Sequence, residues 1–164
     1  EYLNNLKFSK DAVKIGIEAL KKSAVIVTDT QMARTGVNKS TLEALGGEAF
    51  CFMADEEIAA AAKANGTTRA TASMDKAASL NRPVIFAIGN APTALVRIYE
   101  LVKEGKLKPE LIIGVPVGFV NVVESKELIM ELDIPYIVAK GRKGGSNVAA
   151  AICNAMLYQC KPRG

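Results

Sequence analysis

The sequence of 164 residues contains no histidine. This absence excludes a Ser-His-Asp triad, a Cys-His dyad and a histidine-ligated metal within the chain. Aromatic residues amount to 5%, and the basic residues behind the net charge of +4 are scattered, so nucleic acid is a poor candidate for a partner. The mild positive balance favours an acidic small molecule instead.

Long apolar runs and paired cysteines are also lacking. The longest apolar runs reach about six residues, far short of a membrane span. The sequence contains no basic start followed by an apolar segment, the pattern that would indicate a secretory signal. The three cysteines, Cys51, Cys153 and Cys160, form no C-x-x-C pair, which is typical of reduced thiols in the cytoplasm. We therefore expect a cytoplasmic protein with no membrane partner.

The composition, 49% apolar and 23% charged, is that of a globular protein, and the length favours one domain. Short β-branched runs alternate with amphipathic segments. This pattern predicts an α/β protein: a single doubly wound domain over residues 1–164, with a mostly parallel sheet of about five strands and helices on both faces. Because the sequence begins with Glu1 rather than Met, we also expect an N-terminal stretch to be missing.

The pattern also places the individual elements. Ser9 is the expected N-cap of the first helix, and Thr67 or Thr68 that of the third. Strands are expected at residues 24–27, 49–53, 83–88, 111–115 and 135–139, and helices at residues 10–22, 55–65, 68–80, 93–103, 122–132 and 146–159.

Unusual residues follow four of the five expected strands. The segments are residues 28–39, 89–93, 116–120 and 141–147, and each contains glycine. In an open parallel sheet all four meet at the carboxyl edge, where ligands bind. The connections at the opposite edge, residues 21–23, 81–82 and 105–110, have the composition of ordinary loops. We therefore expect the binding site at the carboxyl edge.

Four features each allow two interpretations. The turn at residues 141–146 joins two cations to a helix N-terminus, which attracts phosphate or carboxylate, or it is an ordinary turn with a solvated Arg-Lys pair. Asp29 acts in acid–base chemistry, or it accepts hydrogen bonds from loop amides. Arg69 opposes the macrodipole of its helix, so it grips a carboxylate, or it is a solvated cation. Residues 145–160, a helix without charge, are buried under the sheet or lie at a subunit interface.

Four motifs occur together and in order: Thr28-Asp29-Thr30-x-Met32; Gly89-Asn90-Ala91-Pro92-Thr93-Ala94-Leu95; Gly114-Val115-Pro116-Val117-Gly118-Phe119-Val120 with Glu124-Ser125-Lys126; and Gly141-Arg142-Lys143-Gly144-Gly145-Ser146-Asn147. From about residue 8 to residue 158, the chain resembles the precorrin-8X methylmutase family, in particular its cobalt-precorrin-8 branch. The resemblance implies an isomerase of cobalamin biosynthesis. Such an enzyme moves a methyl group from C-11 to C-12 of the corrin precursor and yields hydrogenobyrinic acid or its cobalt counterpart.

The resemblance also implies partners and a missing group. The corrinoid tetrapyrrole is the substrate, no separate cofactor is needed, and cobalt, where present, belongs to the substrate. Family members are homodimers that hold the macrocycle in a cleft shared between subunits. The family's single proton-transferring histidine lies in an N-terminal segment ahead of Glu1. We therefore expect this chain to bind corrinoid without turning it over, either because it is truncated or because it is a divergent protein.

Two rival interpretations stay open at this point. A non-catalytic corrinoid-binding protein would also lack the histidine. A phosphate or nucleotide enzyme would rest on residues 141–146, although the usual phosphate fingerprints are absent.

The carboxyl edge carries five cations that suit a substrate with many carboxylates: Arg34, Lys39, Arg69, Arg142 and Lys143. No catalytic residue and no metal ligand is expected within the chain. The expected substrate contacts are Thr28, Asp29, Met32, Thr35, Gly36, Val37, Asn38, Arg69, Asn90, Gly118, Arg142 and Ser146.

Overall fold

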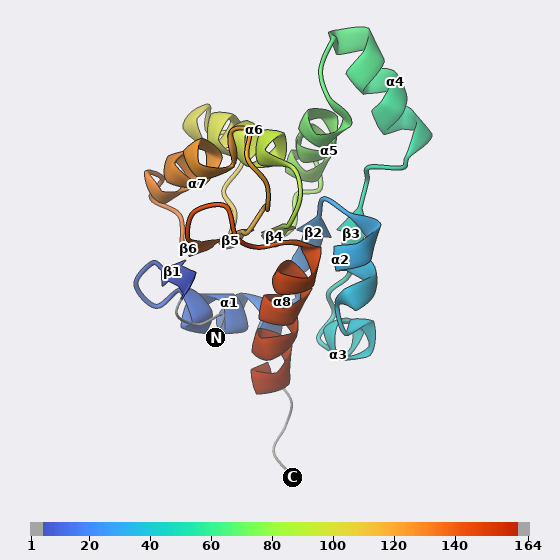
Figure 1. Cartoon of the computed structure of the whole chain (residues 1–164). Coiled ribbons are helices and arrows are strands. Elements are labelled where there is room, and N and C mark those ends of the chain that lie inside the picture. The colour runs from blue at the N-terminus through green and yellow to red at the C-terminus, as the bar shows by residue number, and fades with distance from the viewer. Residues whose placement is uncertain (1–4, 161–164) are drawn as a thin grey trace.

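A six-stranded sheet forms the middle layer of the structure, a computed structural model that describes residues 5–160 (Figure 1). The strand order is β1-β6-β5-β4-β2-β3. Five strands are parallel, and β1 pairs antiparallel with β6 at one edge. The strands are β1 (Leu6–Phe8), β2 (Val25–Thr28), β3 (Ala49–Cys51), β4 (Val84–Ile88), β5 (Leu111–Gly114) and β6 (Tyr136–Ala139).

The central strands form because their side chains are apolar on both faces. Every residue of β2, β4 and β5 is buried, as expected of parallel strands covered by helices on each side. The sheet therefore separates two apolar clusters. One contains Val27, Phe86 and Ile112, and the other contains Ile26, Ile85 and Ile113.

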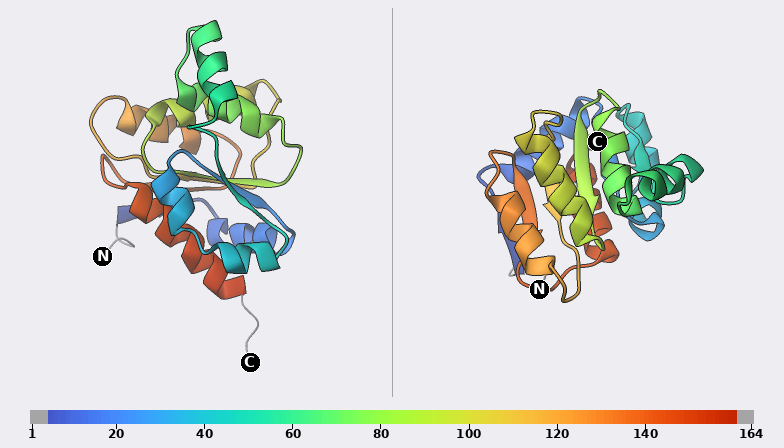
Figure 2. Two further views of the ribbon diagram at one scale, coloured as in Figure 1. Left: turned by 90° about the vertical axis from the view of Figure 1, so that its right-hand side faces the viewer. Right: turned by 90° about the horizontal axis from the view of Figure 1, so that it is seen from above.

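Helices cover both faces of the sheet (Figures 1 and 2). The first cluster lies under α5 (Arg69–Ala78), α6 (Pro92–Lys103) and α7 (Val122–Met130), with part of α4 (Glu56–Asn65). The second lies under α1 (Ala12–Lys21), α2 (Gln31–Gly36), α3 (Lys39–Ala44) and α8 (Ser146–Cys160). The expected α/β fold with helices on both faces is confirmed.

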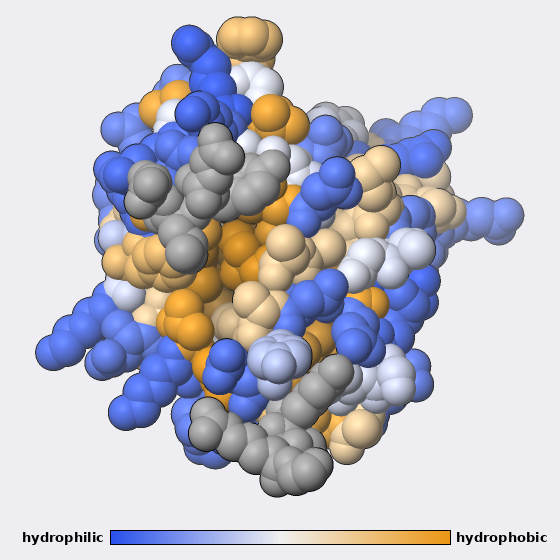
Figure 3. All heavy atoms as spheres, turned by 60° about the horizontal axis from the view of Figure 1, so that its bottom comes forward, coloured by the Kyte–Doolittle hydropathy of each residue, from blue (hydrophilic) through white to orange (hydrophobic). Residues whose placement is uncertain are grey.

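Helix α8 packs beneath the sheet. Its inward side buries six residues, among them Cys153 and Met156, against α1, α2 and the strands. Its outward side exposes only uncharged residues, including Tyr158 at 70%. Figure 3 shows the side of the molecule formed by α1, α3 and α8, where apolar side chains gather between charged ones.

Helix α4 projects from the body of the molecule (Figures 1 and 2). It packs chiefly on α5, through its buried residues Ile58 and Ala62. Gly66 ends it in a left-handed conformation, as the Asn65-Gly66 pair predicts. Its remaining faces are largely exposed.

Several details differ from the sequence-based expectations. The sheet has six strands rather than five, because the short strand β1 is only partly buried and leaves no apolar run. Ser9 does not cap the first helix: its hydroxyl accepts a hydrogen bond from the backbone N–H of Tyr136 at 2.8 Å, and Asp11 occupies the N-cap position. Helices α2 and α3 replace most of the loop expected at residues 28–39.

No helix within residues 5–160 is long and apolar enough to span a membrane.

Candidate functional site

Four loop segments meet at the carboxyl edge of the sheet. Strands β2, β4, β5 and β6 are consecutive neighbours and parallel, so the segments that follow them lie side by side. Figure 1 shows the connection from β6 to α8 passing along this edge beside the ends of β5 and β4. We call this edge, with residues 28–32, 89–91, 115–120 and 141–146, the rim.

Asp29 organises the turn that follows β4. The side chain is 2% exposed. Its Oδ1 accepts a hydrogen bond from the N–H of Gly89 at 2.9 Å, and its Oδ2 accepts from Asn90 at 2.9 Å and Ala91 at 2.6 Å. Burial raises the pKa of Asp29 above its ordinary value, while these backbone donors act in the opposite direction. The carboxylate thus binds loop amides, which was one of the two interpretations of this residue, and holds the exposed Asn90 at the rim.

The start of α8 is packed tightly against β2 and β4. The hydroxyls of Thr30 and Ser146 lie 2.8 Å apart in a hydrogen bond. A Cβ atom added at Gly89 would lie 2.7 Å from the backbone of Ser146, so only glycine permits this approach. Thr28 lies below, with its hydroxyl donating to the backbone oxygen of Thr30 at 2.9 Å. Thr28, Asp29, Asn90 and Ser146 are therefore brought together.

Residues 141–145, which we call the 141–145 turn, are fastened to the segment after β5. The N–H of Gly145 donates to Val115 O at 2.7 Å, and the N–H of Gly118 donates to Arg142 O at 3.3 Å. Gly144 has φ +143°, and a Cβ there would lie 2.0 Å from Val115 O. This close approach brings Gly118 and Arg142 to the same part of the rim.

Exposed apolar side chains occur along the rim, and one of them, Phe119, contacts Arg142. Its guanidinium carbon lies 5.4 Å from the centre of the Phe119 ring, in a cation–π contact. Phe119 is 77% exposed and Val120 79%, with Val117 at 49%. Met32, on the first turn of α2, is 65% exposed. Large exposed apolar side chains of this kind mark binding surfaces.

The segment at residues 35–38 lies along α8, outside the rim. Asn154 of α8 fastens it: Asn154 Oδ1 accepts from the N–H of Asn38, and Nδ2 donates to Gly36 O, both at 2.7 Å. Asn154 is eight residues beyond Ser146, about 12 Å along the helix axis. Thr35, Gly36, Val37 and Asn38 thus lie along α8 rather than directly beside Ser146. A Cβ added at Gly36 would lie 2.9 Å from the Cβ of Ala150, one helical turn beyond Ser146.

Arg69 is exposed at the first position of α5, and the hydroxyl of Thr68 caps this helix by accepting from Thr71 N–H at 3.1 Å. The adjacent residues Thr67 and Thr71 line a polar hollow of 560 Å³ with Thr93 of α6. Thr93 lies one residue after Pro92, at the end of α6 that follows the rim. The start of α5 therefore faces the start of α6 across this hollow.

Two of the five cations expected at the carboxyl edge bind backbone oxygens. Arg34 Nε donates to Ala49 O of the edge strand β3 at 3.0 Å. Lys39 Nζ donates to Arg34 O at 3.1 Å and Thr35 O at 3.2 Å. These contacts stabilise the ends of β3 and α2. Arg69, Arg142 and Lys143 are exposed.

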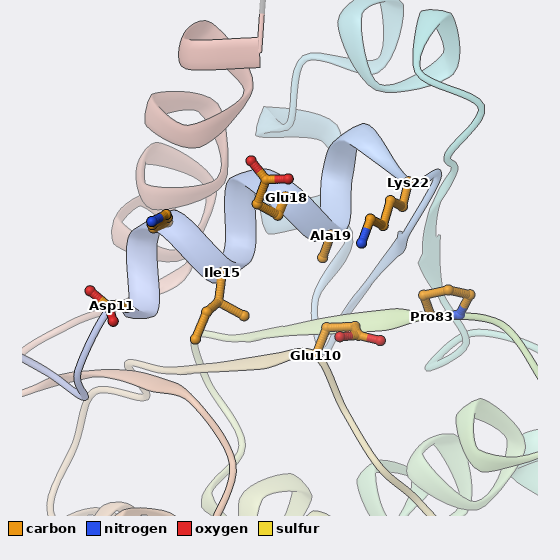
Figure 4. A pocket seen from close by; sticks show the side chains of 8 residues that line it. Asp11, Ile15, Glu18, Ala19, Lys22, Pro83 and Glu110 are labelled. Atoms are coloured by element: carbon orange, nitrogen blue, oxygen red, sulfur yellow. The ribbon is translucent and has the colours of Figure 1, made fainter.

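A separate hollow lies at the opposite edge of the sheet (Figure 4). It has a volume of 470 Å³ and is lined by α1 together with Pro83 and Glu110, which precede β4 and β5. It contains charges of both signs, from Lys14, Lys22 and Glu18 among others. None of the expected substrate contacts lines it.

The described residues offer little for metal or thiol chemistry. No group of three or more His, Cys, Asp or Glu side chains within residues 5–160 could hold a metal ion. Cys51 and Cys153 are buried, and burial raises the pKa of Cys153 to about 12, which disfavours the reactive thiolate.

Lys126 of α7 was not among the expected contacts, and the structure connects it to the rim. It is 2% exposed, and its Nζ donates to Gly141 O and Lys143 O, both at 2.8 Å. The sequence contains a signal for its burial: Val122, Ser125, Lys126 and Ile129 follow the spacing of a buried helical stripe.

The fold and the rim define an open, mostly parallel α/β protein with a candidate ligand site at the carboxyl edge. Comparisons with known proteins then identify the family. A sequence model of the precorrin-8X methylmutase family matches residues 1–159. The chain belongs to the precorrin-8X methylmutase family, whose members are isomerases.

Relatives of known name agree with this assignment. The chain is 45% identical to a cobalt-precorrin-8 methylmutase of Leptospira interrogans, over 100% of this chain and 78% of the relative. It is 44% identical to one of Salmonella typhimurium, over 98% and 75%. A precorrin-8X methyl mutase structure from Thermus thermophilus superposes with a TM-score of 0.87 at 36% identity, covering 98% of this chain and 78% of that one. The methylmutase expected from the motifs is confirmed, and these relatives give no support to a non-catalytic protein.

Proposed function

We propose that the chain binds cobalt-precorrin-8 at its rim, in the enzyme that moves a methyl group from C-11 to C-12 of the ring. The observation that carries this proposal is the Arg142 guanidinium lying over exposed Phe119, beside Val117 and Val120. A broad macrocycle with acidic arms suits a surface that joins exposed apolar side chains to a cation. The cobalt form is favoured because the Leptospira and Salmonella relatives are both named cobalt-precorrin-8 methylmutases.

Each expected substrate contact has a proposed role. Arg142 and Arg69 pair with carboxylate arms, since guanidinium binds carboxylate through two parallel hydrogen bonds. Asn90 and Ser146 donate hydrogen bonds to the ring periphery, and Met32 and Gly118 allow the flat ring to approach. Thr28 and Asp29 act from below by holding the rim turns in place. Residues 35–38 contact a more distant arm of the same substrate.

Methyl migration needs protonation of the ring, and this sequence contains no histidine. In the family that the motifs resemble, one histidine donates and accepts that proton. Asp29 is a poor substitute, because its carboxylate is buried and binds three backbone N–H groups. We expect turnover to require a histidine from outside these 164 residues. We expect the reaction to need no separate cofactor, because cobalt enters with the substrate.

The assembly is proposed to be a cytoplasmic homodimer in which two rims share one cleft. The exposed apolar side chains at Val117, Phe119 and Val120 support such an interface.

The test is a titration with cobyrinic acid or hydrogenobyrinic acid, followed by visible absorption. We expect saturable binding by this chain, and methyl migration only when a histidine-bearing N-terminal segment from a relative is joined to it. Arg69→Ala should weaken binding and leave the fold intact. Loss of saturable binding in both proteins would overturn the proposed site, and binding without migration in the extended protein would overturn the proposed source of the proton.

A further inference from the structure

Lys126 is a buried lysine with no acidic partner within residues 5–160. Lysine is rarely buried unless it is paired, because its charge loses hydration. Here desolvation lowers the pKa of Lys126 to about 8. The ammonium is satisfied by two backbone oxygens, those of Gly141 and Lys143, both at 2.8 Å. Because burying an unpaired ammonium is unfavourable, Lys126 is expected to have a specific role in this part of the fold.

The two oxygens bound by Lys126 stand on either side of Arg142. The oxygen of Arg142 itself accepts from Gly118 N–H at 3.3 Å. Three successive carbonyl groups of the 141–145 turn are therefore bound by the body of the protein. The N–H groups of Arg142, Lys143 and Gly144 have no acceptor within the described residues, so they are left for water or for a ligand.

The position of the Arg142 side chain follows from this arrangement. Binding on both sides of residue 142 fixes its backbone, and the side chain then lies over Phe119 at 5.4 Å. Arginine in a mobile loop would lose rotamer freedom on meeting a carboxylate, which weakens binding. A turn whose backbone is already held presents the guanidinium with less of that loss.

We propose that Lys126 is a positioning residue that fixes the 141–145 turn, so that Arg142 and the neighbouring N–H groups meet one acidic arm of the corrinoid. This inference rests on the proposed function of the rim and deepens it. Lys126 itself does not touch the substrate. It acts from α7, through the backbone of the turn.

The experiment is a double-mutant cycle on corrinoid binding, read as the Kd for cobyrinic acid by visible absorption. Lys126→Met removes the donors while keeping the length of the side chain, and Arg142→Ala removes the positioned group. Each variant should raise Kd about tenfold, the size expected from one charge-assisted hydrogen bond. The double variant should bind no worse than either single variant, because the two residues act in series.

A matched control is Lys108→Met, which removes one exposed lysine at the opposite edge of the sheet. It should leave Kd unchanged, and this separates an effect of the turn from an effect of net charge. If Lys126→Met fails to fold, the cycle is run with Lys126→Gln, whose amide keeps a donor group for one carbonyl.

Trypsin supplies a readout that needs no corrinoid. Trypsin cleaves after arginine and lysine, so Arg142 and Lys143 report whether the turn is held. Lys126→Met should speed cleavage there at least tenfold, whereas Lys108→Met should not.

Equal cleavage of the wild-type and Lys126→Met proteins would overturn the anchoring role. If the effects of the two single substitutions on Kd multiply in the double variant, the proposal that Lys126 acts through Arg142 is overturned. If neither the wild-type chain nor the histidine-extended protein binds cobyrinic acid, the proposed function fails, and with it the substrate part of this inference. The tryptic rates still decide whether Lys126 holds the turn.

Discussion

A single buried carboxylate holds the turn after β4, because Asp29 accepts three backbone hydrogen bonds. Its presence at a strand end could be read from the sequence, but its direction could not. The same residue type at the same place serves a ligand when it points outward and serves the backbone when it points inward. Only the register of β2 against β4, which brings Thr28 opposite Ala87, decides between the two.

Replacing Asp29 by Asn tests this role. The amide keeps one oxygen acceptor but turns an NH2 group toward a backbone donor. Asp29→Asn should therefore lower the free energy of unfolding by about 1.5–3 kcal/mol, the range for hydrogen bonds to a charged group. Urea denaturation measures the change. Asp133→Asn, at an exposed position, is the control and should shift stability by less than about 0.5 kcal/mol. Equal midpoints for the two variants would contradict the role.

Lys126 makes stability depend on pH in a predictable direction. Burial lowers its pKa to about 8, below the ordinary value of 10.5, so above pH 8 the unfolded chain binds a proton that the folded chain does not. The free energy of unfolding should therefore rise with pH in the wild type relative to Lys126→Met, by about 1–2 kcal/mol between pH 7.5 and 9.5. The neutral amine keeps two N–H donors for Gly141 O and Lys143 O.

Urea denaturation of both proteins at several pH values measures this difference. Other charged groups around Lys126, namely Lys7, Glu127, Lys140 and Lys143, are common to both proteins, so their contributions largely cancel. A difference that stays flat or falls with pH would contradict the lowered pKa.

At the scale of elements, the central strands and long helices were predictable because many apolar residues repeat in them. Helices α2 and α3 were not, since each has six residues and buries only one, Ala33 or Leu42. One buried position produces no periodicity. Strand β1 escaped for a similar reason: with two of its three residues exposed, antiparallel pairing to β6 creates it. Tertiary contacts, rather than local pattern, specify these elements.

The contact between β4 and α8 depends on Gly89. An alanine Cβ there would lie 2.7 Å from the Ser146 backbone and would push the start of α8 away from the sheet. Gly89→Ala should lower the free energy of unfolding by about 2–3 kcal/mol, as overpacking does, and should weaken corrinoid binding. Gly105→Ala is the control: its Cβ meets open space, and its φ of +75° should cost only about 1 kcal/mol.

Calorimetry or urea denaturation compares the two glycine variants, and absorption titration follows binding. If Gly89→Ala were no less stable than Gly105→Ala, the tight packing of α8 on β4 would be refuted. Intact binding by a destabilised Gly89→Ala protein would instead place the substrate away from the start of α8.

At the scale of the whole molecule, the exposed apolar side chains of the rim make it the expected interface of the dimer. Sedimentation equilibrium should give twice the chain mass of 17.4 kDa at micromolar concentration. Val120→Glu places a charge on a residue that is 79% exposed and should raise the dimer dissociation constant at least tenfold. Val13→Glu, on a 39% exposed valine of α1, is the matched control and should leave the dimer unchanged. A wild-type monomer would exclude the shared cleft.

The site as a whole was only half predictable. Position at the carboxyl edge followed from the order of elements, and the glycine-rich turns followed from the motifs. The role of each residue could not be predicted. Residues 35–38 lie along α8 and are held by Asn154, and Arg34 and Lys39 bind backbone oxygens. These outcomes depend on where short helices place their ends, which no local pattern encodes.

The direction of β1 has a consequence for engineering a proton donor into the site. Because β1 runs antiparallel to β6, Asn5 lies beside Lys140, and the N–H of Lys140 donates to Asn5 O. A histidine-bearing segment fused ahead of this strand would be tethered next to the 141–145 turn, not at the far edge of the sheet. A short flexible tether confers an effective concentration of roughly millimolar. The same segment added as a free peptide would need about that concentration to support turnover to the same extent as the fused segment.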